Sequence, residues 1–174
     1  WGILKGYFTW IGNVFQGDLG RSFKYEDSVS TIIVENMGIS FGIAFAALIL
    51  EFIIAIPLGV KAATNQYGVV DYSASVLSMI GTALPTFFFA AICIQLFSVQ
   101  LGWFPVNGLT STLPSDATEW TRFWDKIWHL VIPVFIMVFL SVGSLMRYTR
   151  TNTLEVLNAD YIRTARAKGL SEGK

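Results

Sequence analysis

Three long apolar stretches separated by polar segments dominate this sequence. The first, residues 38–60, has Glu51 as its only charged residue and would reach roughly 34 Å as an α-helix. The second, residues 73–99, would reach roughly 40 Å, and the third, residues 128–146, is near the minimum length for a membrane span. Because the hydrocarbon core of a bilayer is roughly 30 Å thick, each stretch predicts a transmembrane helix.

Pro85 and Pro133 lie inside the second and third stretches. Pro85 is in the middle of the second one, which is longer than a bilayer requires, so we expect this helix either to tilt or to bend at Pro85. Pro133 falls in the early turns of the third stretch, where a missing N–H is least harmful.

The basic residues predict how the spans are oriented. Residues 147–174 carry six Lys and Arg, whereas residues 100–127 carry two. Since cytosolic flanks are richer in Lys and Arg, we predict that 147–174 is cytosolic and that 100–127 is an external loop. It follows that 61–72 is a short cytosolic loop and that 1–37 is an external flank.

The composition supports a membrane protein. The chain of 174 residues is 53% hydrophobic, too apolar for one water-soluble core of this size, and its mean hydropathy is +0.56. We therefore expect an all-α, polytopic helical bundle in the cell membrane, with lipid as its solvent. The formal net charge of zero gives no basic footprint for nucleic acid. The start at Trp1, without a signal peptide, leads us to expect a chain truncated at both ends.

Glu51 is a candidate for lining a transport pathway. An ionised carboxylate in the middle of a span costs about 3 kcal/mol, so its side chain should face the bundle or a cavity. The middles of the other two stretches contain no titratable Asp, Glu, Lys, Arg or His. Structural pairing or pathway lining is therefore favoured over a proton relay.

Ser75, Ser78, Thr82 and Thr86 recur at three- and four-residue spacing in the second stretch. On one helix they would form a polar stripe that could line a wet path, aided by the carbonyl that Pro85 frees. Alternatively, the hydroxyls bond to their own helix or to another span. Both interpretations stay open at this point.

The sequence predicts no catalytic residue and no metal site. His129 has no second His or Cys nearby to complete a ligand set, and no Ser or Thr is paired with a recognisable base. The run from Gly169 to Lys174 has three residues between its glycines instead of the four of a phosphate loop, and it follows no strand. We therefore expect no ATP site and no bound cofactor in this chain.

Asp160 to Lys168 is predicted to be a short helix. An acidic residue begins it and basic residues end it, which suits the helix dipole, and Gly169 can adopt the left-handed conformation of a C-cap. Two alanines near its end keep it slim, so it could insert into a cleft on a partner protein. A basic helix lying on anionic lipid is the alternative, which Asp160 makes less favourable.

Residues 160–170, Asp-Tyr-Ile-Arg-Thr-Ala-Arg-Ala-Lys-Gly-Leu, resemble the cytoplasmic EAA-type loop of ATP-binding-cassette importers, in the form found in oligopeptide and dipeptide permease subunits. The segments 147–150 (Arg-Tyr-Thr-Arg), 101–108 (Leu-Gly-Trp-Phe-Pro-Val-Asn-Gly) and 17–22 (Gly-Asp-Leu-Gly-Arg-Ser) resemble the same subunits in the same order. Where the general motif has Glu-Ala-Ala, residues 163–165 are Arg-Thr-Ala, which fits the peptide branch.

This resemblance implies a type I importer permease, the first of two permease subunits, in a bacterial or archaeal plasma membrane. It implies as partners a second permease subunit, cytosolic ATPase subunits that bind the ATP, and an external binding protein that delivers peptide substrate. By the same resemblance, the helix would dock into the ATPase as a coupling helix. The coupling residues would be Asp160, Tyr161, Arg163, Thr164, Ala165, Arg166, Ala167, Lys168 and Gly169.

Two other classes remain at this point. A fragment of a secondary transporter or channel would use Glu51 and the Ser/Thr-lined helix for ion coupling. A membrane scaffold would use its basic tail only to bind lipid or a cytosolic partner.

Overall fold

The computed structural model describes residues 1–169, except for the side chain of Arg166, so the end of the predicted segment 147–174 lies outside the described residues. The regular secondary structure of the described part is helical, with an isolated bridge between Arg21 and Ser28, and the prediction of an all-α fold is confirmed. The elements are α1 (Gly2–Phe15), α2 (Val29–Thr64), α3 (Val69–Ala83), α4 (Thr86–Cys93), the π-helix η1 (Ile94–Gln100), α5 (Glu119–Leu157) and α6 (Asp160–Ala167).

The chain divides into two units, Trp1–Ile43 and Ala44–Lys174, which are described separately. In the N-terminal unit, α2 begins at Val29, although the apolar pattern predicted a span from residue 38. Ser28 explains the early start, because its hydroxyl accepts a hydrogen bond from the Thr31 amide at 3.1 Å. The predicted flank 1–37 therefore contains α1 and the first turns of α2.

In the second unit, α2 continues to Thr64, so the predicted loop 61–72 is reduced to the four residues 65–68. The helix passes residue 60 because Ala62 and Ala63, both good helix formers, are buried. Tyr67 has φ of +64°, which lets the chain reverse within this short turn before α3.

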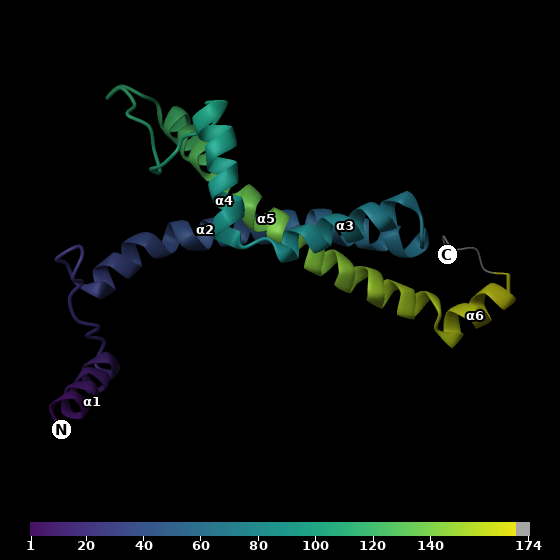
Figure 1. Cartoon of the computed structure of the whole chain (residues 1–174), viewed down its shortest axis with the longest axis horizontal. Coiled ribbons are helices and arrows are strands. Elements are labelled where there is room, and N and C mark those ends of the chain that lie inside the picture. Colours follow the sequence, from purple (N-terminus) through teal and green to yellow (C-terminus); the bar gives the residue numbers. More distant parts are fainter. Residues whose placement is uncertain (170–174) are drawn as a thin grey trace. The chain divides into compact units, whose positions relative to one another are not determined.

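The second predicted span, 73–99, is two helical segments that meet at 103° (Figure 1). The break falls at Leu84, whose backbone is extended because a residue before proline is disfavoured in the α conformation. Pro85 then begins the next segment, and its carbonyl accepts hydrogen bonds from the amides of Phe88 and Phe89. Of the two expectations for this stretch, the bend is correct.

The third predicted span, 128–146, is the middle of a much longer helix. The helix α5 begins at Glu119 because the Thr118 side chain caps it, accepting from the Thr121 amide at 3.2 Å. The end of the predicted loop 100–127 is therefore helical, and residues 147–157 continue the helix. With 39 residues, α5 reaches roughly 58 Å and is longer than a bilayer core is thick.

The helices α3 and α5 pack closely through small residues. A Cβ added to Gly143 of α5 would lie 2.6 Å from the Ser78 Cα of α3, and one added to Gly81 would lie 3.1 Å from the Phe139 carbonyl oxygen. Glycines of this kind let helix backbones approach each other in membranes. A second contact joins α4 to α5, where the rings of Phe89 and Phe139 stack with centroids 4.6 Å apart.

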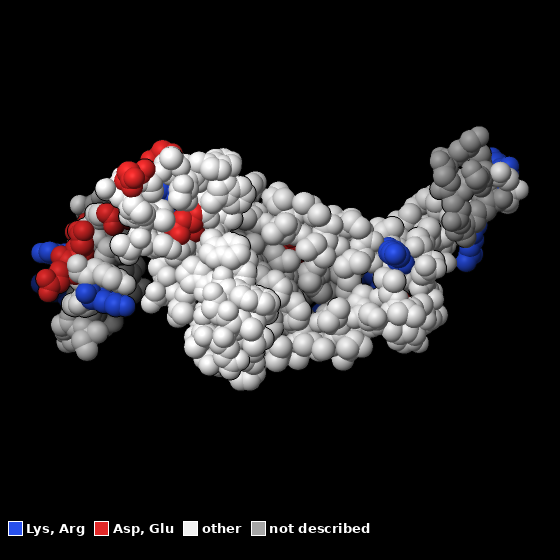
Figure 2. All heavy atoms as spheres, turned by 90° about the horizontal axis from the view of Figure 1, so that it is seen from above, with Lys and Arg blue, Asp and Glu red and all other residues white. Residues whose placement is uncertain are grey.

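Much of the apolar surface is exposed, as in a protein whose helices face lipid or other subunits. Within the described residues, two helices, α2 and α5, are long and apolar enough to cross a membrane, and the bent pair of α3 with α4 and η1 would be a third span if it crosses as one. On the face seen in Figure 2, the long apolar helices are almost free of charged side chains.

Candidate functional site

The four predicted pathway hydroxyls do not form one stripe. Ser75 and Ser78 lie on α3, but Thr86 is on α4, beyond the bend at Pro85. The expectation of a single polar face is therefore wrong, because it assumed one continuous helix.

Two of these hydroxyls donate to backbone carbonyls, one on another helix and one on their own. Ser78 is 2% exposed and donates to the Gly143 carbonyl of α5 at 3.0 Å. Thr82 donates back to the Ser78 carbonyl of its own helix, also at 3.0 Å. Of the other two, Ser75 is half-buried and Thr86 is exposed. The contribution of these residues to a pathway stays a prediction.

Glu51 lies on the packed face of α2. Its side chain is half-buried. Ala47, Ala55 and Gly59 lie on the same face of the helix at four-residue spacing, and all three are buried. This face meets α5, since a Cβ added to Gly59 would lie 2.8 Å from the Met146 carbonyl oxygen. The carboxylate therefore lies on the side of α2 that faces other helices, and its role in transport stays a prediction.

The predicted coupling residues lie on α6 and at its C-terminal end. The prediction of a helix from Asp160 to Lys168 agrees with α6 to within one residue, and Gly169 has the expected left-handed φ of +76°. The Thr164 hydroxyl donates to the Asp160 carbonyl of its own helix at 2.9 Å. The coupling residues with exposed positions are Asp160, Tyr161, Arg163, Thr164, Ala167, Lys168 and Gly169, and Ala165 is half-buried.

Only two residues separate α6 from α5, and both are held by hydrogen bonds. The Asn158 amide donates to the Leu154 carbonyl at 3.1 Å, and the Ala159 carbonyl accepts from the amides of Ile162 and Arg163. With the last turn of α5 and the first turn of α6 both bonded to this link, little slack remains between the helices.

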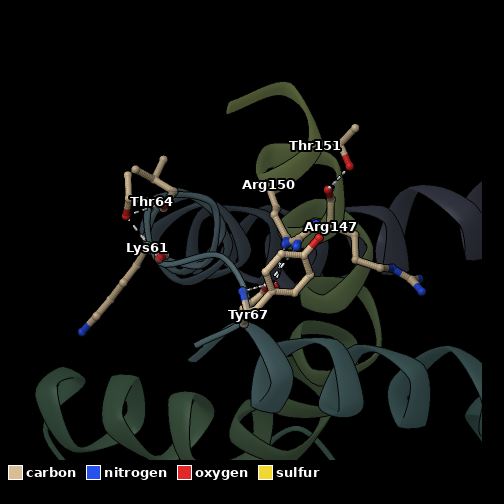
Figure 3. A network of polar contacts seen from close by, with 8 residues as sticks. Lys61, Thr64, Tyr67, Arg147, Arg150 and Thr151 are labelled. Atoms are coloured by element: carbon tan, nitrogen blue, oxygen red, sulfur yellow. Dashed lines mark hydrogen bonds and ion pairs between the residues drawn. The ribbon is translucent and has the colours of Figure 1, made fainter. Parts of the chain in front are cut away.

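An ion pair between Asp71 and Arg150 was missed by the sequence reasoning. The Arg150 guanidinium donates from Nε to Oδ1 at 2.6 Å and from Nη2 to Oδ2 at 2.7 Å, so the pair is bidentate. Asp71 is 5% exposed, and its Oδ2 also accepts from the Tyr67 amide at 3.0 Å. Figure 3 shows Arg150 and Tyr67 pointing toward each other, while Lys61 and Arg147 point away.

A signal for this pair does exist in the sequence. Asp71 is the only acidic residue between residues 61 and 72, and Arg150 ends the Arg-Tyr-Thr-Arg segment. Pairing them required the register between two helices, which the hydrophobic pattern does not provide.

His129 lines a cavity of about 340 Å³ bounded by α4, α5 and residues 105–108. Its Nδ1 lies 2.7 Å from the Asp125 carbonyl oxygen of the preceding turn, a contact that orients the ring. The described part of the chain holds no group of three or more His, Cys, Asp or Glu that could bind a metal ion.

Comparisons with known proteins place these features in a family. Residues 55–174 match the family described as binding-protein-dependent transport system inner membrane component. The chain is 41% identical over 169 residues to the oligopeptide transport system permease protein AppB of Bacillus subtilis, covering 97% of this chain and 52% of the relative. It is 38% identical over 163 residues to a putative peptide transport system permease protein of Brucella suis, covering 94% and 50%.

A third relative, the di/tripeptide transport system permease protein DppB of Pseudomonas aeruginosa, is 33% identical over 187 residues, covering 99% of this chain and 55% of the relative. The chain spans about half the length of the curated relatives it matches. Since the family match takes in α3 to α6 and most of the chain, this protein belongs to the family of inner membrane components of binding-protein-dependent transport systems.

Proposed function

We propose that this chain forms part of the translocation pathway of an ATP-driven peptide importer, as a membrane-spanning permease subunit. The observation that carries the proposal is α6, a short capped helix with most of its predicted coupling residues exposed, held at the end of a long membrane helix. The relatives are named as permease proteins for oligopeptides, peptides and di- or tripeptides, which supports peptide as the substrate class.

In this proposal, the chain itself carries out no covalent chemistry. ATP binding and hydrolysis belong to separate cytosolic ATPase subunits, and an external binding protein delivers the peptide. A second permease subunit completes the pathway, which the helices of this chain border on one side.

In this scheme, α6 docks into a cleft on the ATPase. The exposed ring of Tyr161 is the largest side chain available for that contact, since 63% of it is accessible. When the ATPase subunits close on ATP, α6 moves with them, and the hydrogen-bonded link at Asn158 and Ala159 carries the motion into α5. The chain therefore responds to ATP as a set of rigid helices.

The secondary-transporter alternative has less support. It relied on Glu51 and on a continuous hydroxyl stripe. The Ser78 hydroxyl instead bonds to α5, the Thr82 hydroxyl bonds to its own helix, and Thr86 lies beyond the bend. The features that remain do not form an ion path within the described residues.

Replacing Tyr161 by alanine in the assembled transporter tests the docking. Aromatic residues at the centre of an interface contribute about 2 kcal/mol or more, so the affinity of the ATPase for the permease should fall roughly thirtyfold. Tyr148 is the matched control, because it is a similarly exposed tyrosine, at 69%, on α5 and outside the coupling helix.

Co-purification of the ATPase subunits and peptide uptake into proteoliposomes are measured for both variants. We expect Tyr161→Ala to lose both and Tyr148→Ala to retain both. Equal behaviour of the two variants would show that α6 does not dock through this face.

A further inference from the structure

The contact between α3 and α5 is an antiparallel seam of small and polar residues. Along it, residue numbers rise on α3 while they fall on α5. The facing pairs are Asp71 with Arg150, Ala74 with Met146, Ser78 with Gly143, and Gly81 with the backbone of Phe139. We use the name α3–α5 seam for these four pairs.

Most of the seam has little to prevent one helix from sliding along the other. Glycine, alanine and serine give a close approach of the backbones, but they offer small side chains that interlock weakly. The hydrogen bond from Ser78 to the Gly143 carbonyl is a single contact. The contact that fixes the register between α3 and α5 must therefore lie elsewhere on the seam.

The ion pair at one end of the seam has the required geometry. A carboxylate and a guanidinium that share two parallel hydrogen bonds must be coplanar, so they fix both the distance and the rotation between the groups. A single buried polar contact is known to specify the register of packed helices in coiled coils.

Asp71 also ties the turn between α2 and α3 to this pair. Its Oδ2 accepts from the amide of Tyr67, a residue that holds a left-handed φ of +64°. The strained turn, the start of α3 and the side of α5 therefore meet at one carboxylate.

The position of Arg150 along α5 places the ion pair between α6 and the rest of the seam. Arg150 lies between the seam contact at Gly143 and the end of α5 at Leu157, where the link to α6 begins. A displacement of α6 thus reaches the ion pair before it reaches the rest of the seam.

We propose that Asp71 and Arg150 are positioning residues that lock the register of α3 and α5, so that a movement of α6 displaces both helices together. This rests on the proposed function, since it requires α6 to be driven by the ATPase. Without the lock, α5 would move along α3, and part of the ATPase motion would not reach the helices bordering the pathway. The expected defect is therefore wasted ATP, with the ATPase still bound.

The test uses the complete transporter in lipid nanodiscs and proteoliposomes. Arg150→Lys keeps the positive charge beside Asp71 but loses the planar fork. A double variant, Asp71→Asn with Arg150→Gln, removes both charges together and leaves no unpaired buried ion. The matched control is Arg147→Lys, one turn earlier on α5, whose exposed side chain points away from the pair (Figure 3).

Three quantities are measured: the amount of ATPase bound, the rate of ATP hydrolysis, and the peptide imported. We expect both pair variants to bind the ATPase and hydrolyse ATP as the wild type does, but to use more ATP per peptide, on the order of fivefold or more, the lower end of coupling factors between distant sites. Arg147→Lys should be unchanged.

Two outcomes would overturn the proposal. If the ATP used per peptide stays at the wild-type value, the pair does not transmit motion. If ATPase binding or the yield of folded complex falls in both variants in step with transport, the pair is only a structural contact. Failure of the proposed function is seen separately, as ATPase binding that does not respond to Tyr161→Ala.

Discussion

Gly143→Ala tests the close approach of α3 and α5 directly. The added methyl would lie 2.6 Å from the Ser78 Cα, 2.8 Å from its Cβ and 2.9 Å from its Oγ. An ordinary van der Waals separation is about 3.5–4.0 Å, so the helices must separate by roughly 1 Å at this point. The closest contact is with the Ser78 Cα, a backbone atom, so a change of the Ser78 rotamer cannot relieve it.

The cost has two parts. Overpacking of a well-fitted interface typically costs about 1–3 kcal/mol, and loss of the hydrogen bond from Ser78 to the Gly143 carbonyl adds about 0.5–1.5 kcal/mol. Alanine returns up to about 1 kcal/mol because it is a better helix former than glycine. The net loss in the free energy of unfolding should be about 0.5–4.5 kcal/mol.

The assay is reversible unfolding of the purified protein in mixed detergent micelles, followed by tryptophan fluorescence. Ser144→Ala is the control, since it adds no atoms at the neighbouring exposed position of α5. A Gly143→Ala protein as stable as this control would refute the packing of α3 on α5 described here.

Three further predictions follow from local geometry. Pro85→Ala lets Leu84 become helical, so spin labels on α3 and α4 should move apart as the 103° bend opens; an unchanged distance would show that packing on α5 holds the bend. Ser78→Ala should lower stability by about 1 kcal/mol and Thr82→Ala by less than about 0.5 kcal/mol, because only Ser78 bonds to another helix; chemical unfolding of both variants checks the order. Gly169→Ala strains a φ of +76° by about 1 kcal/mol or more, so binding of the ATPase should weaken in co-purification, and wild-type binding would contradict the role of this cap.

The parts of the fold that depend on local signals could be predicted from the sequence. The apolar stretches marked the middles of the membrane helices, and α6 was recognisable because Asp160 and Gly169 are signals at its two ends. The starts of α2 and α5 could not be predicted in this way. Their N-caps, Ser28 and Thr118, lie in polar sequence, where hydropathy carries no information.

The features that depend on contacts between distant residues could not be predicted. The proline at position 85 allowed either a tilt or a bend, and the hydropathy pattern cannot distinguish them because the stretch is apolar on both sides of the proline. The pairing of Asp71 with Arg150 joins residues 79 positions apart, so it becomes visible only once α3 and α5 are in register. The same holds for Ser78, whose hydroxyl looked like part of a polar path until its acceptor on α5 was known.

Cross-linking shows whether α6 docks to an ATPase. A photoreactive amino acid is placed at Tyr161 or, in a separate protein, at Tyr148, and the assembled transporter is irradiated with and without ATP. We expect a cross-link from position 161 to the ATPase subunit and none from position 148, although both side chains are exposed. A transporter that imports peptide but gives no cross-link from position 161 in either state would contradict it.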